Sequence, residues 1–198
     1  MRVLVVGGAG YIGAHVCEEL VNAGYDVRIY DDFSNGLHSR ITKFPDVVTA
    51  DVLDRESLVK AMAGVDSVIH LAAKKAVGES VDNPLKYYEN NFGGTLNILA
   101  AMKIAGVKKI VFSSTAAVYS PSEKPAITEE DSTIPLSPYG ATKLLSEQLI
   151  SNVSSAEGFS CVSLRYFNVA GSGSDEMGDN SRDNLVPKVF LAITNGER

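Results

Sequence analysis

Apolar residues of this chain gather in six short, nearly continuous runs, and longer stretches with a helical pattern fill the intervals between them. Continuous runs of this kind are typical of strands that are buried on both faces of a parallel sheet. We therefore expect strands at Arg2–Val6, Val27–Tyr30, Val47–Ala50, Ser67–Leu71, Lys109–Phe112 and Cys161–Arg165.

The intervals predict helices at Tyr11–Ala23, Ser57–Met62, Pro84–Ala105, Pro138–Glu157 and Leu185–Thr194. Asn83 and Ser137 each precede a proline, and such pairs are typical of an N-cap followed by a first-turn proline. Strands and helices that alternate, joined by right-handed crossovers, predict an α/β fold with a doubly wound parallel sheet and helices on both of its faces.

Two stretches lack a regular period. Ser120–Ser137 is polar and contains prolines, so we expect a surface loop there. Gly171–Asp183 is rich in Gly, Ser, Asp and Asn, which is equally consistent with a loop that covers a ligand and with a flexible loop.

Composition narrows the range of functions. The 198 residues suffice for one domain, and a net charge of −6 without a basic patch argues against nucleic acid as a partner. Cys17 and Cys161 are expected to be small buried hydrophobes, without a disulfide. His15, His38 and His70 share no spacing typical of metal ligands, so no metal site is predicted. No apolar run is long enough for a signal peptide or a membrane span, and we expect a cytoplasmic protein.

A glycine-rich loop joins the first strand to the first helix. Gly7, Gly10 and Gly13 are spaced so that the backbone can turn sharply and approach a pyrophosphate, while the helix N-terminus offers free N–H groups. Because the glycines lie between a strand and a helix, as a dinucleotide site requires, we expect a Rossmann-like nucleotide-binding fold.

The next strand ends in Asp31, whose carboxylate can accept hydrogen bonds from both hydroxyls of an adenosine ribose. The same carboxylate would repel a 2′-phosphate, and Asp31–Leu37 contains no Lys or Arg, so we expect NAD as the cofactor in preference to NADP. Asp51, after the third strand, is a candidate acceptor for the adenine amino group and alternatively an N-cap or turn residue.

Candidate catalytic residues follow later in the chain. Tyr139 and Lys143 are four residues apart and share one face of a helix, so the ammonium is expected to lower the phenol pKa from its ordinary value of about 10. Thr115 follows a strand and could bind a substrate hydroxyl. Alone, the Tyr–Lys pair is also what a solvent-facing helix shows, but together with the glycine loop and Asp31 it predicts alcohol oxidation.

Several longer motifs reinforce this interpretation: Lys75–Ser80, Pro84-Leu85, Tyr87–Asn91, Ser113-Ser114, Val118-Tyr119, Ser137–Gly140, Leu164–Asn168, Met177-Gly178 and Asn184-Leu185. On these motifs, the whole chain resembles the UDP-glucose (UDP-galactose) 4-epimerases of the extended short-chain dehydrogenase/reductase family. The chain departs from the family pattern at Val6 (usually Thr), at Ala73-Lys74 (usually Gly-Leu) and at Thr115 (often Ser).

The resemblance implies roles for individual residues. The NAD-binding residues would be Gly7, Gly10, Tyr11, Ile12, Gly13, Asp31, Asp32, Phe33, Ser34, Asn35, Gly36, Asp51, Val52, the segment Leu71, Ala72, Ala73, Lys74 and Lys75, and Asn90, Ser113, Tyr139, Lys143 and Phe167. The substrate-binding residues would be Lys75, Thr115, Tyr139, Asn168, Asn184 and Leu185. Thr115, Tyr139 and Lys143 would be catalytic.

The mechanism that the resemblance implies is inversion at C4 of a UDP-hexose through a 4-keto intermediate, with Tyr139 as the base. Residues 1–198 would form the NAD-binding domain, with the substrate-binding region starting at residue 169. Because family members are longer, the chain is expected to lack most of the substrate domain and to epimerise poorly alone. A homodimer would form through the 84–105 and 138–157 helices. Two alternatives stay open: a nucleotide-sugar 4,6-dehydratase or decarboxylase, and a non-catalytic NAD-binding sensor.

Overall fold

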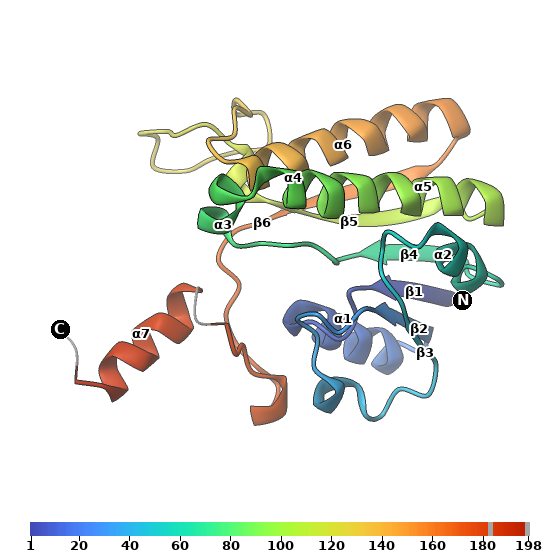
Figure 1. The fold of residues 1–198 in the computed structure, drawn as a ribbon, viewed down its shortest axis with the longest axis horizontal. Coiled ribbons are helices and arrows are strands. Elements are labelled where there is room, and N and C mark those ends of the chain that lie inside the picture. The colour runs from blue at the N-terminus through green and yellow to red at the C-terminus, as the bar shows by residue number, and fades with distance from the viewer. Residues whose placement is uncertain (182–183, 197–198) are drawn as a thin grey trace.

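The computed structural model describes residues 1–181 and 184–196 and shows a parallel six-stranded sheet in the order β3-β2-β1-β4-β5-β6 (Figure 1). The strands are β1 (Arg2–Val6), β2 (Asp26–Asp31), β3 (Val47–Thr49), β4 (Ser67–His70), β5 (Lys109–Thr115) and β6 (Ser160–Tyr166). The predicted α/β fold with a parallel sheet is confirmed. The order reverses between β1 and β4, and in such sheets ligands bind beyond the carboxyl ends of the strands at this switch point.

Seven α-helices are described in these residues: α1 (Tyr11–Asn22), α2 (Arg55–Ala61), α3 (Val77–Asp82), α4 (Pro84–Tyr87), α5 (Gly94–Ala105), α6 (Pro138–Glu157) and α7 (Leu185–Thr194). Short 3₁₀ turns lie at His38–Ile41, Ala116–Val118 and Asp175–Met177. The bounds of α6 and α7 agree with the prediction, while α3 was not predicted.

The helix predicted at Pro84–Ala105 is not continuous. A π-helical turn, Tyr88–Gly93, separates α4 from α5. Pro84 occupies the first turn of α4, but the side chain of Asn83 makes no capping hydrogen bond, so that predicted cap is wrong. At α6 the prediction holds, because the Ser137 hydroxyl accepts a hydrogen bond from the Gly140 N–H at 3.1 Å.

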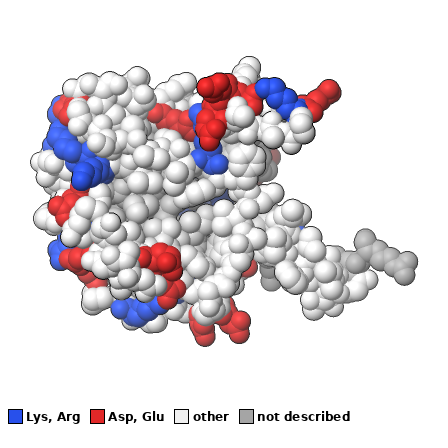
Figure 2. Space-filling model, turned by 180° about the vertical axis from the view of Figure 1, so that it is seen from behind, with Lys and Arg blue, Asp and Glu red and all other residues white. Residues whose placement is uncertain are grey.

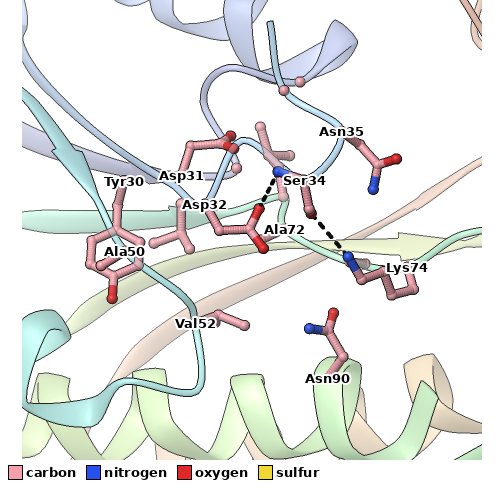
Figure 3. A pocket seen from close by; sticks show the side chains of 16 residues that line it. Tyr30, Asp31, Asp32, Ser34, Asn35, Ala50, Val52, Ala72, Lys74 and Asn90 are labelled. Atoms are coloured by element: carbon pink, nitrogen blue, oxygen red, sulfur yellow. Dashed lines mark hydrogen bonds between the residues drawn. The ribbon is translucent and has the colours of Figure 1, made fainter. Parts of the chain in front are cut away.

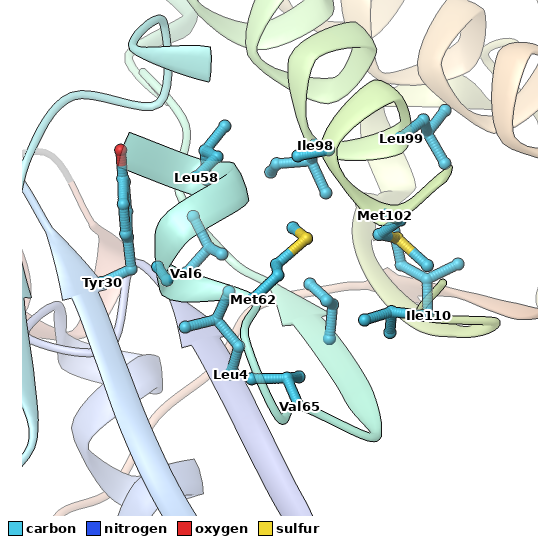
Figure 4. Close-up of a cluster of buried hydrophobic side chains, with 14 of the residues drawn as sticks. Leu4, Val6, Tyr30, Leu58, Met62, Val65, Ile98, Leu99, Met102 and Ile110 are labelled. Carbon is cyan, nitrogen blue, oxygen red and sulfur yellow. The ribbon is translucent and has the colours of Figure 1, made fainter. Parts of the chain in front are cut away.

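Alternate residues of β1 point to opposite faces of the sheet and serve two cores. Leu4 and Val6 pack with residues of α2 and α5, among them Ile98 (Figure 4). Val3 and Val5 pack on the other face with Ala14 and Cys17 of α1 and with the segment after β2. The expectations of helices on both faces and of a buried Cys17 are therefore confirmed.

The edge strand β6 departs from the prediction that all strands are buried. Cys161 is exposed, and Val162 keeps 53% of its surface accessible. The physical reason is that β6 has a neighbouring strand on one side only, while the apolar helix α7 stands away from it (Figure 1). Seen from behind, the projecting α7 is almost free of charged atoms (Figure 2). No helix in the described ranges is long and apolar enough to cross a membrane.

Candidate dinucleotide and catalytic site

The glycine loop brings β1, α1 and the end of β4 into very close contact. Gly7 has a φ of +87°, and a Cβ on it would lie 2.5 Å from the Ala72 backbone nitrogen. A Cβ on Gly13 would lie 2.1 Å from the Gly7 carbonyl oxygen. Helix α1 starts after Gly10 without a side-chain cap, so its first-turn N–H groups stay available to an anion.

A cleft lies above this loop, at the carboxyl ends of β1, β2 and β4 (Figure 3). Many predicted cofactor residues line it: Gly7, Gly10, Asp31, Asp32, Ser34, Asn35, Gly36, Val52, Leu71, Ala72, Ala73 and Asn90. Lys74, within the implied Leu71–Lys75 segment, also lines it, whereas sequence reasoning missed three further lining residues: Val6, Tyr30 and Ala50. Each of the three is adjacent in sequence to a predicted residue, so extending every predicted segment by one residue would have found them.

Other predicted cofactor residues lie outside the lining of this cleft. Phe33 stacks on His38 with ring centroids 3.7 Å apart. The Asp51 carboxylate accepts a hydrogen bond from the Leu53 N–H at 2.8 Å, which is the geometry of a turn residue. Lys75 is exposed, and Phe167 keeps 62% of its surface accessible. Also outside it are Tyr11, Ile12, Gly13, Ser113, Tyr139 and Lys143.

Asp31 is held at the cleft by the backbone. Its two carboxylate oxygens accept hydrogen bonds from the N–H groups of Ala9 and Phe33, both at 2.9 Å. The residue is 7% exposed, and this burial raises the pKa of its carboxyl group, while the two hydrogen bonds oppose the rise. Because each oxygen can accept a further hydrogen bond, Asp31 retains acceptor capacity for a ligand.

The three predicted catalytic residues meet at the end of β5. Tyr139, in the first turn of α6, lies close enough to the Thr115 hydroxyl for that hydroxyl to favour its phenolate and act to lower its pKa. Lys143, one turn later, donates to the Ser113 carbonyl oxygen at 2.7 Å and lies 4.7 Å above the Phe112 ring. The fold thus brings together a hydroxyl, a phenol and an ammonium from two elements.

The electrostatics of this group differ from the expectation. The pKa of Tyr139 is raised, because burial disfavours the phenolate more than the Thr115 hydroxyl favours it. Lys143 is itself buried, which lowers its pKa to about 7 although the nearby Glu147 opposes the shift. The predicted lowering of the Tyr139 pKa by Lys143 is therefore wrong here, since desolvation of both groups dominates.

Two residues that were not among the predicted site residues contact the elements that carry the cleft or this group. Asn91, in the π-helical turn, hydrogen-bonds to the N–H of Lys74 at 2.8 Å and to its carbonyl at 2.9 Å, and reaches Thr142 Oγ1 at 3.3 Å. His70 is buried beside Lys143 with a pKa lowered to about 3, chiefly by desolvation, so its ring is neutral. The irregular helix around Asn91 offers no periodic signal in the sequence.

Two of the predicted substrate residues, Thr115 and Tyr139, belong to this group, and the others lie on separate segments. Asn168 follows β6 and is exposed, while Asn184 and Leu185 lie at the start of the projecting α7 (Figure 1). Asn184 donates a hydrogen bond to Asp179, and Leu185 keeps 59% of its surface accessible. Many of the predicted cofactor residues therefore share one cleft, whereas the predicted substrate residues are spread over several segments.

Most of Gly171–Asp183 is described, except residues 182–183. The Tyr11 hydroxyl donates to the Gly171 carbonyl, and the Gly173 N–H lies 3.3 Å from His15 Nε2. Met177 is buried in the core beside α1. This segment is thus seated on α1, and none of its described residues lines the cleft.

Comparison with known proteins agrees with the geometry of this cleft. The model of the "NAD dependent epimerase/dehydratase family" matches residues 3–198. A UDP-glucose 4-epimerase of Bacillus subtilis is 43% identical over 203 residues, covering 96% of this chain and 60% of its own length. The chain spans about 60% of the length of the curated relatives it matches.

Solved structures are similarly close. A UDP-glucose 4-epimerase from Stenotrophomonas maltophila, with bound NAD and formylated UDP-arabinopyranose, superposes with a TM-score of 0.93 at 37% identity, covering 98% of this chain and 62% of that one. A Brucella ovis UDP-glucose 4-epimerase in complex with NAD gives 0.91 at 39% identity, with coverages of 98% and 61%.

Proposed function

The chain belongs to the NAD dependent epimerase/dehydratase family, and from this we propose that residues 1–198 form the NAD-binding domain of an enzyme that inverts C4 of a UDP-hexose, with the substrate-binding region starting at residue 169. The observation that carries the proposal is the group formed by half-buried Thr115 and Tyr139 with buried Lys143, at the same end of the sheet as a glycine-lined cleft. The curated relatives named as UDP-glucose 4-epimerases support the choice of substrate class.

The residues of the cleft fit NAD. A Cβ on Gly7 or Gly13 would meet neighbouring backbone, so these glycines allow the tight turn from β1 into α1. Gly7 and Gly10 line the cleft, and the uncapped start of α1 offers N–H donors to a pyrophosphate. Asp31 has free acceptor capacity for the ribose hydroxyls, and Tyr139 and Lys143 would hold the nicotinamide ribose. NAD is also present in solved relatives.

When bound, NAD supplies a hydride acceptor that can return hydride to either face of a 4-keto sugar. The chain's own residues accept and return the proton. Tyr139 as phenolate takes the proton of the C4 hydroxyl at its Oη and gives it back after the sugar has turned over. Thr115, whose hydroxyl lies near Tyr139, would orient the C4 hydroxyl. Burial raises the pKa of Tyr139, and Lys143 in its charged form would act against that rise and favour the phenolate. Asn168, Asn184 and Leu185 would anchor the UDP group.

The residues that follow Thr115 give no support to the dehydratase alternative. Expelling water from C6 requires an additional acid and base near the reacting carbon. The residues after Thr115 are Ala116 and Ala117, which enter the 3₁₀ turn, and the Ala117 N–H lies 3.2 Å from Thr115 Oγ1. No carboxylate is therefore carried by the positions that directly follow the hydroxyl residue.

Two measurements test the proposal. Calorimetry with NAD tests the cofactor half, and a coupled assay of UDP-galactose conversion tests the chemistry. We expect this chain to bind NAD but to convert UDP-galactose slowly, because Asn184 and Leu185 lie apart from Tyr139 and misplacement by about 1 Å can cost about 100-fold in rate.

Absence of NAD binding would falsify the cofactor proposal. Turnover near an ordinary 10 s⁻¹ would contradict the need for further substrate contacts. A 4-keto-6-deoxy product would favour the dehydratase, and NAD binding without any product would favour the sensor.

The helices α4, α5 and α6 offer a surface for a homodimer, which is part of the proposal. Apolar side chains point outward from them: Leu85, 83% exposed, with Leu96, Ile104 and Leu145 also exposed. Pairing of this surface with a second copy would cover them. Sedimentation of the chain measures its mass directly, and replacing Leu85 and Ile104 by Glu should yield a monomer. A monomer already in the unchanged chain would contradict this part.

A further inference from the structure

Lys74 reaches across the mouth of the dinucleotide cleft. Its Nζ donates a hydrogen bond to Ser34 Oγ at 2.9 Å, which joins the segment after β4 to the loop after β2 (Figure 3). Both residues line the cleft together with Asp31. The loop Asp31–Leu37 contains no Lys or Arg of its own, and the fold brings an ammonium to it from a distant segment.

Both ends of this bridge are fixed. Asn91 hydrogen-bonds to the N–H and the carbonyl of Lys74, so the root of the lysine side chain is held. On the other side, the Ser34 N–H donates to Asp32 at 2.9 Å. Ser34 follows Phe33, which has a φ of +58° and stacks on His38. The position of the ammonium is therefore set by both walls of the cleft.

The charge of Lys74 is available to a ligand. It is the one cation among the residues that line the cleft, where the other charged groups are Asp31 and Asp32. In the described ranges, no carboxylate forms an ion pair with its ammonium. An ammonium has three N–H donors, and Ser34 accepts from one of them, so two remain.

We propose that Lys74 is a specificity-determining residue of the dinucleotide site, whose ammonium accommodates a 2′-phosphate on the adenosine ribose and so weakens the preference for NAD that Asp31 imposes. The inference rests on the proposed binding of NAD, with the ribose at Asp31. A nearby cation is the means by which such sites accept the 2′-phosphate of NADP. Asp31 repels that phosphate, and Lys74, on the opposite wall of the same cleft, offsets the repulsion.

The test is calorimetric titration of the unchanged chain and of Lys74→Met with NAD⁺ and with NADP⁺. We expect the unchanged chain to bind both, NAD⁺ more tightly. Lys74→Met should weaken NADP⁺ binding about 5- to 10-fold, the scale of one partly exposed charged hydrogen bond, and change NAD⁺ binding less than about 2-fold. Lys74→Arg, which keeps the charge, should retain most NADP⁺ affinity.

Two controls sharpen the result. Lys109→Met removes a lysine at the amino end of β5, at the opposite edge of the sheet, and should leave the ratio of the two affinities unchanged. Ser34→Ala keeps Lys74 but removes its hydrogen-bond acceptor, and should weaken NADP⁺ binding in the same direction by a smaller factor. Ser34→Ala also serves as the second variant if Lys74→Met does not fold.

Equal losses for both dinucleotides, no loss for either, or undetectable NADP⁺ binding by the unchanged chain would overturn the inference. These outcomes leave the proposed function intact as long as NAD⁺ binds. If the unchanged chain binds neither dinucleotide, the proposed function and this inference both fail.

Discussion

The cleft around Asp31 and the group around Tyr139 lie at the same edge of the sheet, yet they are positioned by different parts of the chain. At the cleft, main-chain N–H groups of Ala9 and Phe33 hold the carboxylate, and glycines allow the backbones to touch. At the catalytic group, the ionisable and hydroxyl side chains lie close together, and the main chain fixes two of them: Lys143 donates to the Ser113 carbonyl and Thr115 accepts from the Ala117 N–H. The cleft should therefore be sensitive to added atoms, and the catalytic group to changes of charge.

The two regions also carry buried charges of opposite sign. Burial raises the pKa of Asp31 and lowers the pKa of Lys143, so each group is displaced towards its neutral form. Asp31 is compensated by two backbone hydrogen bonds, whereas the pKa of Lys143 falls to about 7 despite Glu147. The catalytic region is consequently the one whose protonation changes near neutral pH.

The largest expected effect is at the catalytic group. Tyr139→Phe removes the proton acceptor and keeps the ring, so turnover of UDP-galactose should fall by about 10²- to 10⁴-fold, the usual contribution of a positioned base. NAD affinity should stay unchanged in calorimetry. The matched control is Tyr166→Phe, at the end of β6. Activity of Tyr139→Phe within a few-fold of the unchanged protein would remove Tyr139 from the role of base.

At the glycine loop, an added methyl group should be destabilising. In Gly13→Ala, the new Cβ would lie 2.1 Å from the Gly7 carbonyl oxygen, so α1 must move away from β1. We expect a loss of about 1–3 kcal/mol in the free energy of unfolding, the range for overpacking. Urea denaturation measures it. Gly78→Ala is the control, because nothing lies within 4 Å of its Cβ position. Equal midpoints for the two variants would contradict the close contact.

Removing the carboxylate of the cleft should act on binding. Asp31→Ala takes away the acceptor for the ribose hydroxyls, and NAD affinity should fall by about 1–3 kcal/mol, the scale of a lost hydrogen bond to a charged group. Discrimination against NADP should relax at the same time. Asp26→Ala, at the amino end of the same strand, is the control. Calorimetry that finds the same NAD affinity in Asp31→Ala would show that the ribose does not bind there.

The smallest expected effect is a pH dependence of stability due to Lys143. Its pKa is 10.5 in its ordinary state and about 7 in the fold, so above pH 7 the unfolded chain binds more protons and stability rises with pH. The rise is at most about 1.4 kcal/mol per pH unit. The rise in stability ends near pH 9. Burial raises the pKa of the Cys17 thiol from 9.0, so above that pH this group makes stability fall as the pH increases.

Lys143→Met should lose this dependence between pH 7 and 9, as measured by urea denaturation at each pH. Lys109→Met, which removes an exposed lysine, should retain it. Parallel stability curves for the unchanged protein and Lys143→Met would show that the lysine keeps its ordinary pKa in the fold.

The sequence predicted the parts of the fold that depend on local pattern. The strand at Arg2–Val6 and the helix at Pro138–Glu157 have the predicted bounds because apolar periodicity and the Ser137 cap are local signals. Exposure of Cys161 was not predictable, because it depends on what packs against the edge of the sheet. The pairing of Lys74 with Ser34 and the raised pKa of Tyr139 likewise depend on burial and on contacts between distant segments.

Because of the π-helical turn at Tyr88–Gly93, the structure between α4 and α5 depends on the number of residues in this stretch. Such a turn contains one residue more than the α-helical repeat requires. Deleting one residue there would let the hydrogen bonds return to the α pattern, but it would rotate the preceding segment by about 100° relative to α5. Asn91 would then lose its alignment with Lys74 and Thr142. In an alignment of homologues, gaps should stay out of this stretch.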